Sequence, residues 1–346
     1  MQAVVVHRPG YVSVERVEDP TCADDGVVIR VSRCGICGTD QHVFAGDYGL
    51  AQYPLIPGHE VAGTVVEVGR AVQTIRPGQQ VVVEPNIHCE RCLPCRTRRG
   101  NHCLNLKVLG INEAGGFATF LQAPERNIYA ADQLTPSQAA FVEPLACVVH
   151  GVCRLAPTPG SRILIAGAGP IGLLMLQTLL HSGAAIITVT DLHASRLALA
   201  QELGASQAVI ATNDNDGELM DIAPLGYDAA VDCTGIPLVI ERLVPRLAPG
   251  GKLLIFGVAP EEAAIRIRPY ELFQRDLTLL GSFAVAYTFD AALALLESGA
   301  VRVDRLVSRS FGLQGFAQGL ELMRKGIDVL KVQLDPALDH DQLTSS

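Results

Sequence analysis

The sequence predicts an α/β fold in which a strand-rich first part precedes a doubly wound second part. Apolar and polar residues alternate with a period of two over much of residues 1–33, which is typical of half-buried strands. From residue 160 onward, apolar strand patterns alternate with helix patterns, as in parallel sheets covered by helices. The chain has 346 residues, so we expect about two domains.

The composition describes an ordinary globular protein. Hydrophobic residues make up 49% of the chain and charged residues 18%. The net charge of −9 argues against general binding to nucleic acid or to an anionic membrane surface. The first residues run into a strand pattern without a secretory signal, and no uninterrupted run of 18 apolar residues appears. We therefore expect a cytoplasmic protein that binds neither nucleic acid nor membrane.

The first strand patterns lead into a segment with candidate metal ligands. These patterns cover residues 4–6, 11–15 and 27–32. Cys37 follows in the run Cys-Gly-Ile-Cys-Gly-Thr-Asp, and Pro-Gly-His59-Glu60 comes about twenty residues later. Thiolate, imidazole and carboxylate are ligands that zinc takes at tetrahedral sites with one open position. Alone, the C-x-x-C pair could be redox-active or structural and the His-Glu pair a surface pair, so the prediction depends on their joint occurrence.

Three polar side chains surround the first of these ligands. Thr39 and His42 follow Cys37 by two and five residues, so a hydroxyl and an imidazole flank the same turn. Asp40 is a candidate partner of His59, because a ligating histidine usually donates its other ring N–H to a carboxylate.

Strand patterns at 61–69 and 79–83 lead to a loop at residues 86–104, which we name the cysteine lobe. It contains four of the ten cysteines, namely Cys89, Cys92, Cys95 and Cys103. Without an export signal we do not expect disulfides. Four thiolates within fifteen residues can surround one zinc ion and leave no position open, which predicts a structural zinc. An iron–sulfur cluster is the alternative. The arginines of this lobe could mark a nucleic-acid patch, but we favour their offsetting the negative charge of a four-thiolate zinc.

A strand pattern at 115–121 is followed by helical spacing over residues 136–154. Glu143 lies within this otherwise apolar stretch, directly before Pro144. Burial of a carboxylate is costly unless it is paired or near a metal. Glu143 is therefore either a capping or surface residue or a group that acts at the zinc, and we favour the zinc.

The second part begins with an apolar strand pattern at 162–166 that runs into a glycine-rich turn. The turn contains Gly167, Gly169, Pro170, Ile171 and Gly172. Such a G-x-G-x-x-G pattern between a strand and a helix is typical of a dinucleotide site, with the pyrophosphate at the helix N-terminus. Asp191 ends the next strand pattern, 19 positions after the third glycine, where it can bind the ribose hydroxyls of NAD and repel the 2′-phosphate of NADP. Arg196 favours NADP, and we weigh it as the lesser influence.

Four more strand patterns bring the second part to six strands, as in a doubly wound dinucleotide-binding sheet. They begin near residues 208, 227, 252 and 277. Two helix patterns follow at 289–297 and 316–325, and a last strand pattern lies at 330–334. We expect residues 339–346 to be frayed.

In this order, the motifs resemble the zinc-dependent medium-chain dehydrogenases, and within them the polyol (sorbitol-type) branch. The resemblance covers roughly residues 1–335. It implies that residues 1–150 and 285–346 form one β-rich, GroES-like catalytic domain. Residues 151–284 would form an inserted NAD-binding Rossmann domain, with the active site in the cleft between the domains. The resemblance also implies a homotetramer.

The same resemblance assigns roles to residues by position. It implies a catalytic zinc whose candidate ligands are Cys37, His59, Glu60 and, directly or through a water, Glu143. Thr39 would take the proton of the substrate hydroxyl, His42 would form the outer end of the proton relay, and Asp40 would orient His59. With the cysteine lobe, this makes two zinc ions per chain. The implied reaction is the reversible oxidation of a secondary alcohol of a polyol or sugar alcohol to a ketone, with NAD.

Two other functions are compatible with parts of this pattern. A threonine or vicinal-diol dehydrogenase shares most of the motifs. A non-catalytic protein that binds zinc and a dinucleotide would have no reason to keep the whole set Cys37, Thr39, His42, His59 and Glu60.

The substrate itself does not follow from the motifs. Sorbitol-type enzymes carry an arginine and two aromatics where this chain has Ala284, Val285 and Val43. We therefore expect a polyol or diol substrate whose distal hydroxyls matter less than in sorbitol dehydrogenases. Tyr287 could restore one polar contact with the substrate or pack in a subunit interface.

Overall fold

The computed structural model describes residues 1–212, 216–326 and 329–338. The chain divides into two compact units. Unit 1 comprises residues 1–146, 285–299 and those from 303 onward, and unit 2 comprises residues 147–284 and 300–302. Each unit has its own core of buried apolar side chains. The expectation for residues 339–346 lies outside the described residues.

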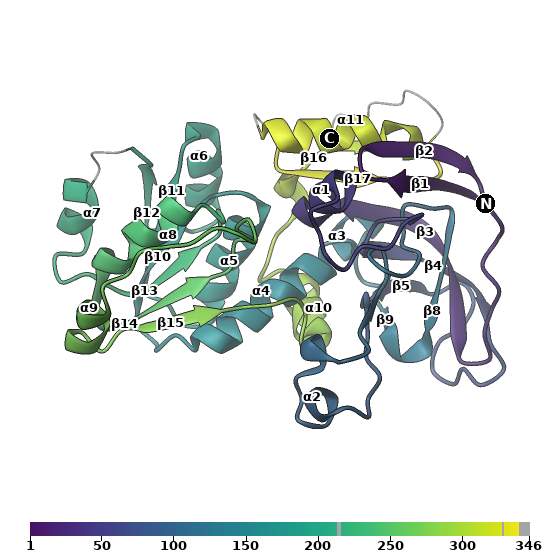
Figure 1. Cartoon of the computed structure of the whole chain (residues 1–346), viewed down its shortest axis with the longest axis horizontal. Coiled ribbons are helices and arrows are strands. Elements are labelled where there is room, and N and C mark those ends of the chain that lie inside the picture. The colour runs from purple at the N-terminus through teal and green to yellow at the C-terminus, as the bar shows by residue number, and fades with distance from the viewer. Residues whose placement is uncertain (213–215, 327–328, 339–346) are drawn as a thin grey trace. The chain divides into compact units, whose positions relative to one another are not determined.

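A seven-stranded sheet forms the centre of unit 1 (Figure 1). Its order is β16-β17-β3-β4-β5-β9, and β8 also pairs with β3. The strands are β3 (Gly26–Ile36), β4 (Glu60–Val68), β5 (Gln80–Val83), β8 (Phe120–Pro124), β9 (Ile128–Ala130), β16 (Val307–Phe311) and β17 (Lys331–Leu334). Val27, Ile29 and Val31 are buried in one core cluster, because alternate side chains of a strand point to the same face.

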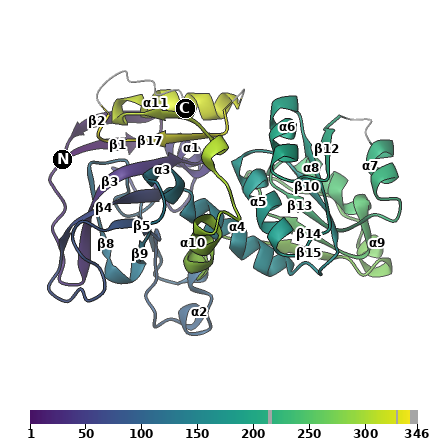
Figure 2. The same cartoon turned by 180° about the vertical axis from the view of Figure 1, so that it is seen from behind.

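Shorter elements complete unit 1. They are the hairpin of β1 (Gln2–Arg8) and β2 (Tyr11–Arg16), the pair β6 (Asn86–Ile87) and β7 (Lys107–Val108), and the helices α1 (Gly38–Ala45), α2 (Leu93–Arg96), α3 (Pro136–Ala139), α10 (Phe289–Glu297) and α11 (Phe316–Lys325). Helix α11 lies along β17 in both views (Figures 1 and 2), and its Phe316 and Leu320 are buried in the same cluster as Val332. Single 3₁₀ turns lie at Gly100–His102, Glu125–Asn127, Val244–Arg246, Asp304–Leu306 and Leu313–Gly315.

Unit 2 contains a six-stranded parallel sheet of order β12-β11-β10-β13-β14-β15. The strands are β10 (Arg162–Ala166), β11 (Ile186–Asp191), β12 (Gln207–Ile210), β13 (Tyr227–Asp232), β14 (Leu247–Ile255) and β15 (Thr278–Gly281). The helices are α5 (Pro170–His181), α6 (Ala194–Glu202), α7 (Asp216–Ile222), α8 (Pro237–Leu243) and α9 (Pro269–Gln274). In order of appearance the strands lie 3-2-1-4-5-6, the doubly wound order that binds dinucleotides.

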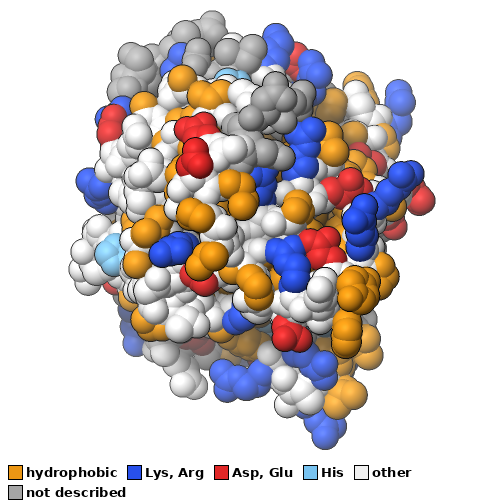
Figure 3. All heavy atoms as spheres, turned by 90° about the vertical axis from the view of Figure 1, so that its left-hand side faces the viewer, with side chains coloured by type: hydrophobic (Ala, Val, Ile, Leu, Met, Phe, Trp, Pro, Cys, Tyr) orange, Lys and Arg blue, Asp and Glu red, His pale blue; other side chains and the backbone are white. Residues whose placement is uncertain are grey.

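Helices flank this sheet as its apolar strands require (Figure 1). Leu164 and Ala230 are buried together with Leu219 of α7 and Ile240 of α8, whereas α5 contacts β10 and β11. On the face of the molecule shown in Figure 3, charged side chains of both signs are interspersed with apolar ones. That face therefore carries no large patch of a single charge. The predicted doubly wound fold is confirmed.

The helix predicted over 136–154 is wrong as one element. The structure has α3 (Pro136–Ala139) and then α4 (Val142–Leu155), which runs from unit 1 into unit 2. Thr135 caps α3 in a reciprocal capping box with Gln138. Pro144 explains the break, because in one long helix its ring would clash with the carbonyl four residues earlier, whereas it is tolerated in the first turn of α4.

Candidate functional site

Cys37 occupies the N-cap of α1, directly after β3 ends. Its backbone is extended, and its N–H donates a hydrogen bond of 2.8 Å to Oδ2 of Asp40. Helix α1 ends at Gly46, which has φ of 84° and donates its N–H to His42 O. The short helix therefore holds Cys37 at the C-terminal end of β3.

His59 and Glu60 are brought to the same place by strand pairing. Glu60 opens β4 and lies opposite Gly35 of β3 in an antiparallel register. A Cβ atom on Gly35 would lie 1.8 Å from Oε2 of Glu60, so any other residue at this position would displace the carboxylate. Gly58, with φ of 97°, turns the chain into β4 in close contact with Phe117.

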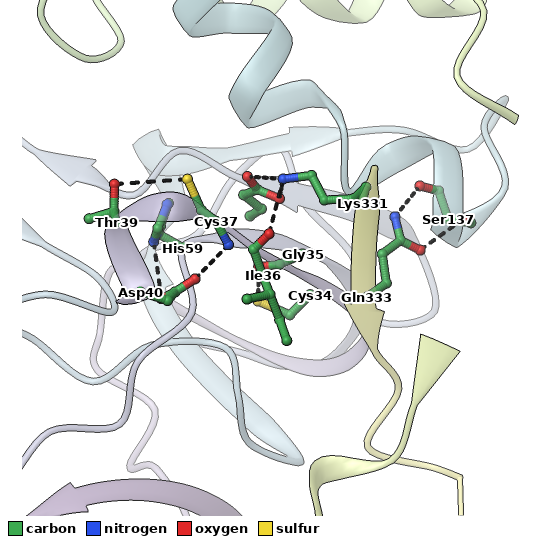
Figure 4. A network of polar contacts seen from close by, with 11 residues as sticks. Cys34, Gly35, Ile36, Cys37, Thr39, Asp40, His59, Ser137, Lys331 and Gln333 are labelled. Carbon is green, nitrogen blue, oxygen red and sulfur yellow. Dashed lines mark hydrogen bonds and ion pairs between the residues drawn. The ribbon is translucent and has the colours of Figure 1, made fainter. Parts of the chain in front are cut away.

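Cys37, His59 and Glu60 each offer a ligand atom, and these atoms lie within 4.8 Å of one another. His59 Nδ1 is 3.8 Å from Oδ1 of Asp40, and both of these buried atoms lack a hydrogen-bond partner (Figure 4). Burial lowers the pKa of His59, but Asp40, Cys37 and Glu143 outweigh it and raise this pKa well above its ordinary value. The cluster is therefore rich in negative charge and suited to a cation.

Lys331 is the member of this site that the sequence analysis missed. It lies on β17 (Figure 4), is 4% exposed, and its Nζ donates hydrogen bonds of 2.6 and 2.8 Å to the two carboxylate oxygens of Glu60. A third bond of 3.2 Å goes to Ile36 O. Burial lowers the pKa of Lys331, but Glu60, Cys37 and Glu143 produce a net rise. No signal in the sequence indicated this pair, because Lys331 alternates with apolar residues as a surface residue of a strand would.

Thr39 and His42 stand one helical turn apart on α1. Thr39 Oγ1 is 3.8 Å from the Cys37 sulfur. His42 Nδ1 is 3.0 Å from Oδ1 of Asp47, at a partly exposed position. The structure thus places Thr39 beside the metal-ligand cluster and His42 towards solvent. Glu143, at the start of α4, is half-buried and is close enough to raise the pKa of both His59 and Lys331.

The cysteine lobe forms a second cluster in unit 1. The ligand atoms of Cys89, Cys92, Cys95 and Cys103 lie within 4.8 Å of one another. The Cys92 sulfur is 3.4 Å from that of Cys95 and 3.8 Å from that of Cys103. Backbone N–H groups of Arg91 and Cys92 lower the pKa of Cys89 to about 6, whereas burial raises the pKa of Cys95 to about 12. No disulfide joins the cysteines, so four sulfur donors are available to one ion.

In unit 2, the glycine-rich turn joins β10 to α5. Gly167 has φ of 101°, and a Cβ atom on Gly172 would lie 1.8 Å from Gly167 O, so strand and helix approach too closely for any other residue. Gly169 is the N-cap of α5 and Pro170 its first residue. A Cβ atom on Gly169 would meet nothing within 4 Å, so the space before the helix N-terminus is open.

Asp191 closes β11 next to this turn, and its carboxylate is already engaged. Oδ2 accepts a hydrogen bond of 2.7 Å from Ala168 N, and Oδ1 accepts one of 2.9 Å from His193 N. His193 Nδ1 lies 3.0 Å from Oδ1, and Arg196 lies 3.8 Å from Oδ2. His193 is a second residue of this region that the sequence analysis missed.

Comparison with known proteins identifies the family. Residues 23–133 match the family described as "Alcohol dehydrogenase GroES-like domain", and residues 170–298 match "Zinc-binding dehydrogenase". D-arabinitol dehydrogenase 1 of Uromyces fabae is 32% identical over 341 residues, which cover 97% of each chain. This chain is a zinc-binding dehydrogenase of the medium-chain family. The family predicted from the motifs is therefore confirmed, and with it an enzyme of the oxidoreductase class.

Other relatives of this dehydrogenase are named for several alcohols. D-altritol 5-dehydrogenase of Agrobacterium fabrum is 38% identical over 83% of this chain and 85% of its own. L-threonine 3-dehydrogenase of Rhizobium rhizogenes is 31% identical over 94% of this chain and 96% of its own. Among the described residues, no helix combines the length and apolar character needed to cross a bilayer.

Solved structures show the same fold. A zinc-binding dehydrogenase of Sinorhizobium meliloti, solved with NADP, aligns with a TM-score of 0.91 and 32% identity, covering 97% of this chain and 99% of that one. An Escherichia coli CFT073 dehydrogenase (RspB), solved with NADH, also aligns with a TM-score of 0.91, at 26% identity and with the same coverage.

Proposed function

We propose that this dehydrogenase reversibly oxidises a secondary alcohol of a polyol or sugar alcohol to the ketone, with NAD⁺ as hydride acceptor. The observation that carries the proposal is the convergence of Cys37, His59 and Glu60 within 4.8 Å in a zinc-binding dehydrogenase. The polyol substrate class is supported by relatives named for D-arabinitol and D-altritol.

The donor set fits a catalytic zinc. One thiol, one imidazole and one carboxylate are ligands that zinc takes at sites with an open position. The buried, unpartnered Nδ1 of His59 and Oδ1 of Asp40 fit a histidine that is held by a carboxylate while it ligates a metal. Cys37, His59 and Glu60 would hold the ion, and Glu143 would act on it directly or through a water. When bound, zinc supplies a Lewis acid that lowers the pKa of an alcohol.

The protein's own residues handle the proton. Thr39 Oγ1 lies beside the cluster and takes the proton from the substrate hydroxyl, since a hydroxyl both accepts and donates. His42, one turn further and partly exposed, passes the proton to solvent, and Asp47 orients its ring through the 3.0 Å contact with Nδ1. Lys331 holds the Glu60 carboxylate in place by two hydrogen bonds.

NAD is the proposed cofactor, rather than NADP. The glycine-rich turn offers open space before the N-terminus of α5, where backbone N–H groups and the helix dipole favour a pyrophosphate. Asp191 closes β11 where its negative charge repels a 2′-phosphate. His193 and Arg196 lie against the same carboxylate and weaken that repulsion, so they favour NADP. We weigh Asp191 as the stronger, because two backbone N–H groups fix its carboxylate in place.

The cysteine lobe is proposed to hold a second, structural zinc, which makes two per chain. Four sulfur atoms within 4.8 Å fill a tetrahedral shell and leave no position for chemistry.

A homotetramer is proposed from the family resemblance. One observation on unit 2 agrees with self-association: β15 is an edge strand whose Leu279 and Leu280 are only half-buried. Native proteins usually cover such an edge.

The experiment that tests the function is a screen for NADH formation. We expect turnover with six-carbon and five-carbon polyols and with vicinal diols. L-Threonine belongs in the panel, because a relative is named for it. Turnover of L-threonine alone would replace the polyol proposal by the threonine one. No NADH from any alcohol would reject both.

A further inference from the structure

We infer that Tyr287 is a positioning residue through which the cysteine lobe holds the segment 285–288 and the first turn of α4, where Glu143 lies. The inference rests on the proposed function for the role of Glu143. It gives the lobe a second task besides stability, because the lobe then controls the geometry of the candidate active site.

Two stretches of chain far apart in the sequence lie side by side in unit 1. Asn86 Nδ2 donates a hydrogen bond of 3.4 Å to Val285 O. Two residues further along each stretch, the rings of His88 and Tyr287 lie 5.6 Å apart between centroids. The first stretch runs directly into Cys89, so a metal bound in the lobe fixes its end.

A further contact reaches the same segment through Tyr129. Tyr129 donates a hydrogen bond of 3.0 Å to Oε2 of Glu84, and its ring lies 5.1 Å from that of Phe289. Asn86 and His88 thus contact the segment directly, and Glu84 is linked to it through Tyr129. Three separate contacts therefore join the two stretches.

Tyr287 is seated within the lobe itself. A Cβ atom on Gly100 would lie 2.7 Å from the Tyr287 hydroxyl and 2.8 Å from the His88 ring, so a larger residue there would displace these side chains. The Arg98 guanidinium lies over the Tyr287 ring, 5.6 Å from the ring centroid. The 3₁₀ turn that carries Gly100 ends at Cys103, a member of the sulfur cluster. These contacts do not decide between the two alternatives given for Tyr287 in the sequence analysis, since 46% of this residue stays exposed.

The backbone around Tyr287 is strained. Ala284 and Tyr287 have φ of 52° and 57°, a region that residues other than glycine rarely adopt. Such conformations cost free energy and persist only where the surroundings impose them. They bracket the point, between residues 284 and 285, where the chain passes from unit 2 to unit 1. The contact of Tyr287 with the lobe helps to impose this conformation, together with the Asn86 hydrogen bond to Val285 and the Thr288 hydrogen bond to Ala146.

The segment 285–288 is also hydrogen-bonded to α4. Thr288 Oγ1 donates a hydrogen bond of 2.7 Å to Ala146 O, and Thr288 is buried. Ala146 lies three residues after Glu143, on the same side of the helix. A displacement of Tyr287 therefore moves Thr288 and with it the turn of α4 that carries the Glu143 carboxylate.

The test compares changes on both sides of the Tyr287 contact. Tyr287→Ala removes the ring and Gly100→Ala pushes it away, so each should lower kcat for the alcohol by about ten- to a hundredfold, as small misplacements of catalytic groups do. The KM for NAD should not change. Both variants should also release zinc from the lobe to a chelator faster than the parent enzyme, because the Tyr287 ring packs against the segments that lead to Cys89 and Cys103. Tyr287→Phe keeps the ring and should resemble the parent.

Two further variants make the outcome specific. Gly100→Ala combined with Tyr287→Phe removes the hydroxyl that the new methyl group meets, so it should recover part of the kcat lost by Gly100→Ala. Tyr270→Ala, an exposed tyrosine of α9, is the matched control and should change nothing. Unchanged kcat and zinc release in Tyr287→Ala would overturn the inference, as would a lower thermal stability with kcat per folded enzyme unchanged. If the parent turns over no alcohol, the proposed function fails, whereas zinc release still tests the link between Tyr287 and the lobe.

Discussion

Lys331 sets the charge of the candidate zinc site more than any other residue. Counting only zinc, Cys37 and Glu60 predicts a neutral centre. In the structure Lys331 donates to both carboxylate oxygens of Glu60, so that pair is neutral by itself. A metal at the cluster therefore keeps more of its positive charge, which strengthens its pull on an alcohol oxygen.

Breaking this pair should be costly. In the zinc-free enzyme, Lys331→Met leaves the Glu60 carboxylate buried without a cation, and we expect a loss of about 3–5 kcal/mol in the free energy of unfolding. The matched control is Lys107→Met, which breaks the exposed pair with Glu113 and should cost less than about 1 kcal/mol. Urea unfolding of both variants measures the difference. Equal small losses would mean that Glu60 and Lys331 do not form the buried pair.

Glu84 gives a prediction about pH. Burial raises its pKa to about 7, Glu143 and Asp290 add to the rise, and the hydrogen bond from Tyr129 opposes it. The folded protein thus binds this proton more tightly than the unfolded chain, so the stability it contributes is complete below the ordinary pKa of 4.5 and is lost as the pH rises through about 7.

Glu84→Gln imitates the protonated carboxyl at every pH. It should therefore stabilise the protein at about pH 8 by on the order of 1–3 kcal/mol and have little effect at about pH 5. Urea unfolding at the two pH values measures this, with Glu297→Gln as the exposed control. A gain at low pH, or none at high pH, would contradict the assigned pKa.

The preference for NAD over NADP is proposed to depend mainly on Asp191. We expect kcat/KM to be higher with NAD than with NADP by about a hundredfold or more, because opposing like charges costs several kcal/mol. Asp191→Asn keeps the shape of the side chain but removes its charge, so it should reduce the difference in kcat/KM between NAD and NADP. Equal values for the parent enzyme, or a preference for NADP, would mean that His193 and Arg196 outweigh Asp191.

At the scale of elements, the cysteine lobe is expected to stabilise unit 1. Cys95→Ser removes one of four sulfur donors, so the lobe should lose its zinc and Tm should fall by roughly 5 °C or more, as a loss of about 2 kcal/mol implies for a domain of this size. Cys153→Ser, at an exposed position of α4, is the control and should leave both unchanged. Metal analysis and thermal unfolding measure the effects. An unchanged Tm together with one lost zinc and no activity would show that the lobe is catalytic rather than structural.

The sequence predicts the elements best where one local pattern decides them. The strands of unit 2 are continuous apolar runs followed by glycine or an acidic residue, and α10 has the predicted bounds of 289–297. The strand predicted at 115–121 is instead β8 (Phe120–Pro124), because residues before it make only an isolated bridge, from Ala118 to Ala3. The single helix predicted over 136–154 was also wrong, because the apolar spacing in the sequence continues across the break that Pro144 causes between α3 and α4.

In the candidate site, too, only the residues carried by short local motifs could be predicted from the sequence. Cys37 and His59–Glu60 are recognisable because short motifs carry them, and the register of β3 and β4 brings them together. Lys331 lies 271 residues from Glu60, and the segment of Tyr287 meets the lobe across 199 residues, from Asn86 to Val285. Nothing local distinguishes either residue from an ordinary strand lysine or loop tyrosine, so these contacts could not be predicted. One correction concerns the residues compared with sorbitol-type enzymes, because Val43 and Val285 are fully buried and therefore line no open pocket.

At the scale of the whole molecule, that correction leaves the substrate expectation in place. Valine and alanine at positions 43, 284 and 285 offer no side-chain hydrogen-bond donor, whether they face a pocket or not. We expect kcat/KM to fall by no more than ~10–200-fold per removed group from six-carbon polyols to four-carbon diols. A site with unidentified polar groups for the distal hydroxyls would instead show a loss of ~10⁴-fold.

The central claim is that Cys37, His59 and Glu60 hold the zinc on which alcohol oxidation depends. The most direct measurement is zinc content per chain together with NADH formation from a polyol, in the parent enzyme and in Cys37→Ser. The account predicts two zinc ions and turnover in the parent, and in Cys37→Ser one zinc, retained in the cysteine lobe, with turnover lost. Full turnover by a Cys37→Ser enzyme that holds one zinc would contradict it.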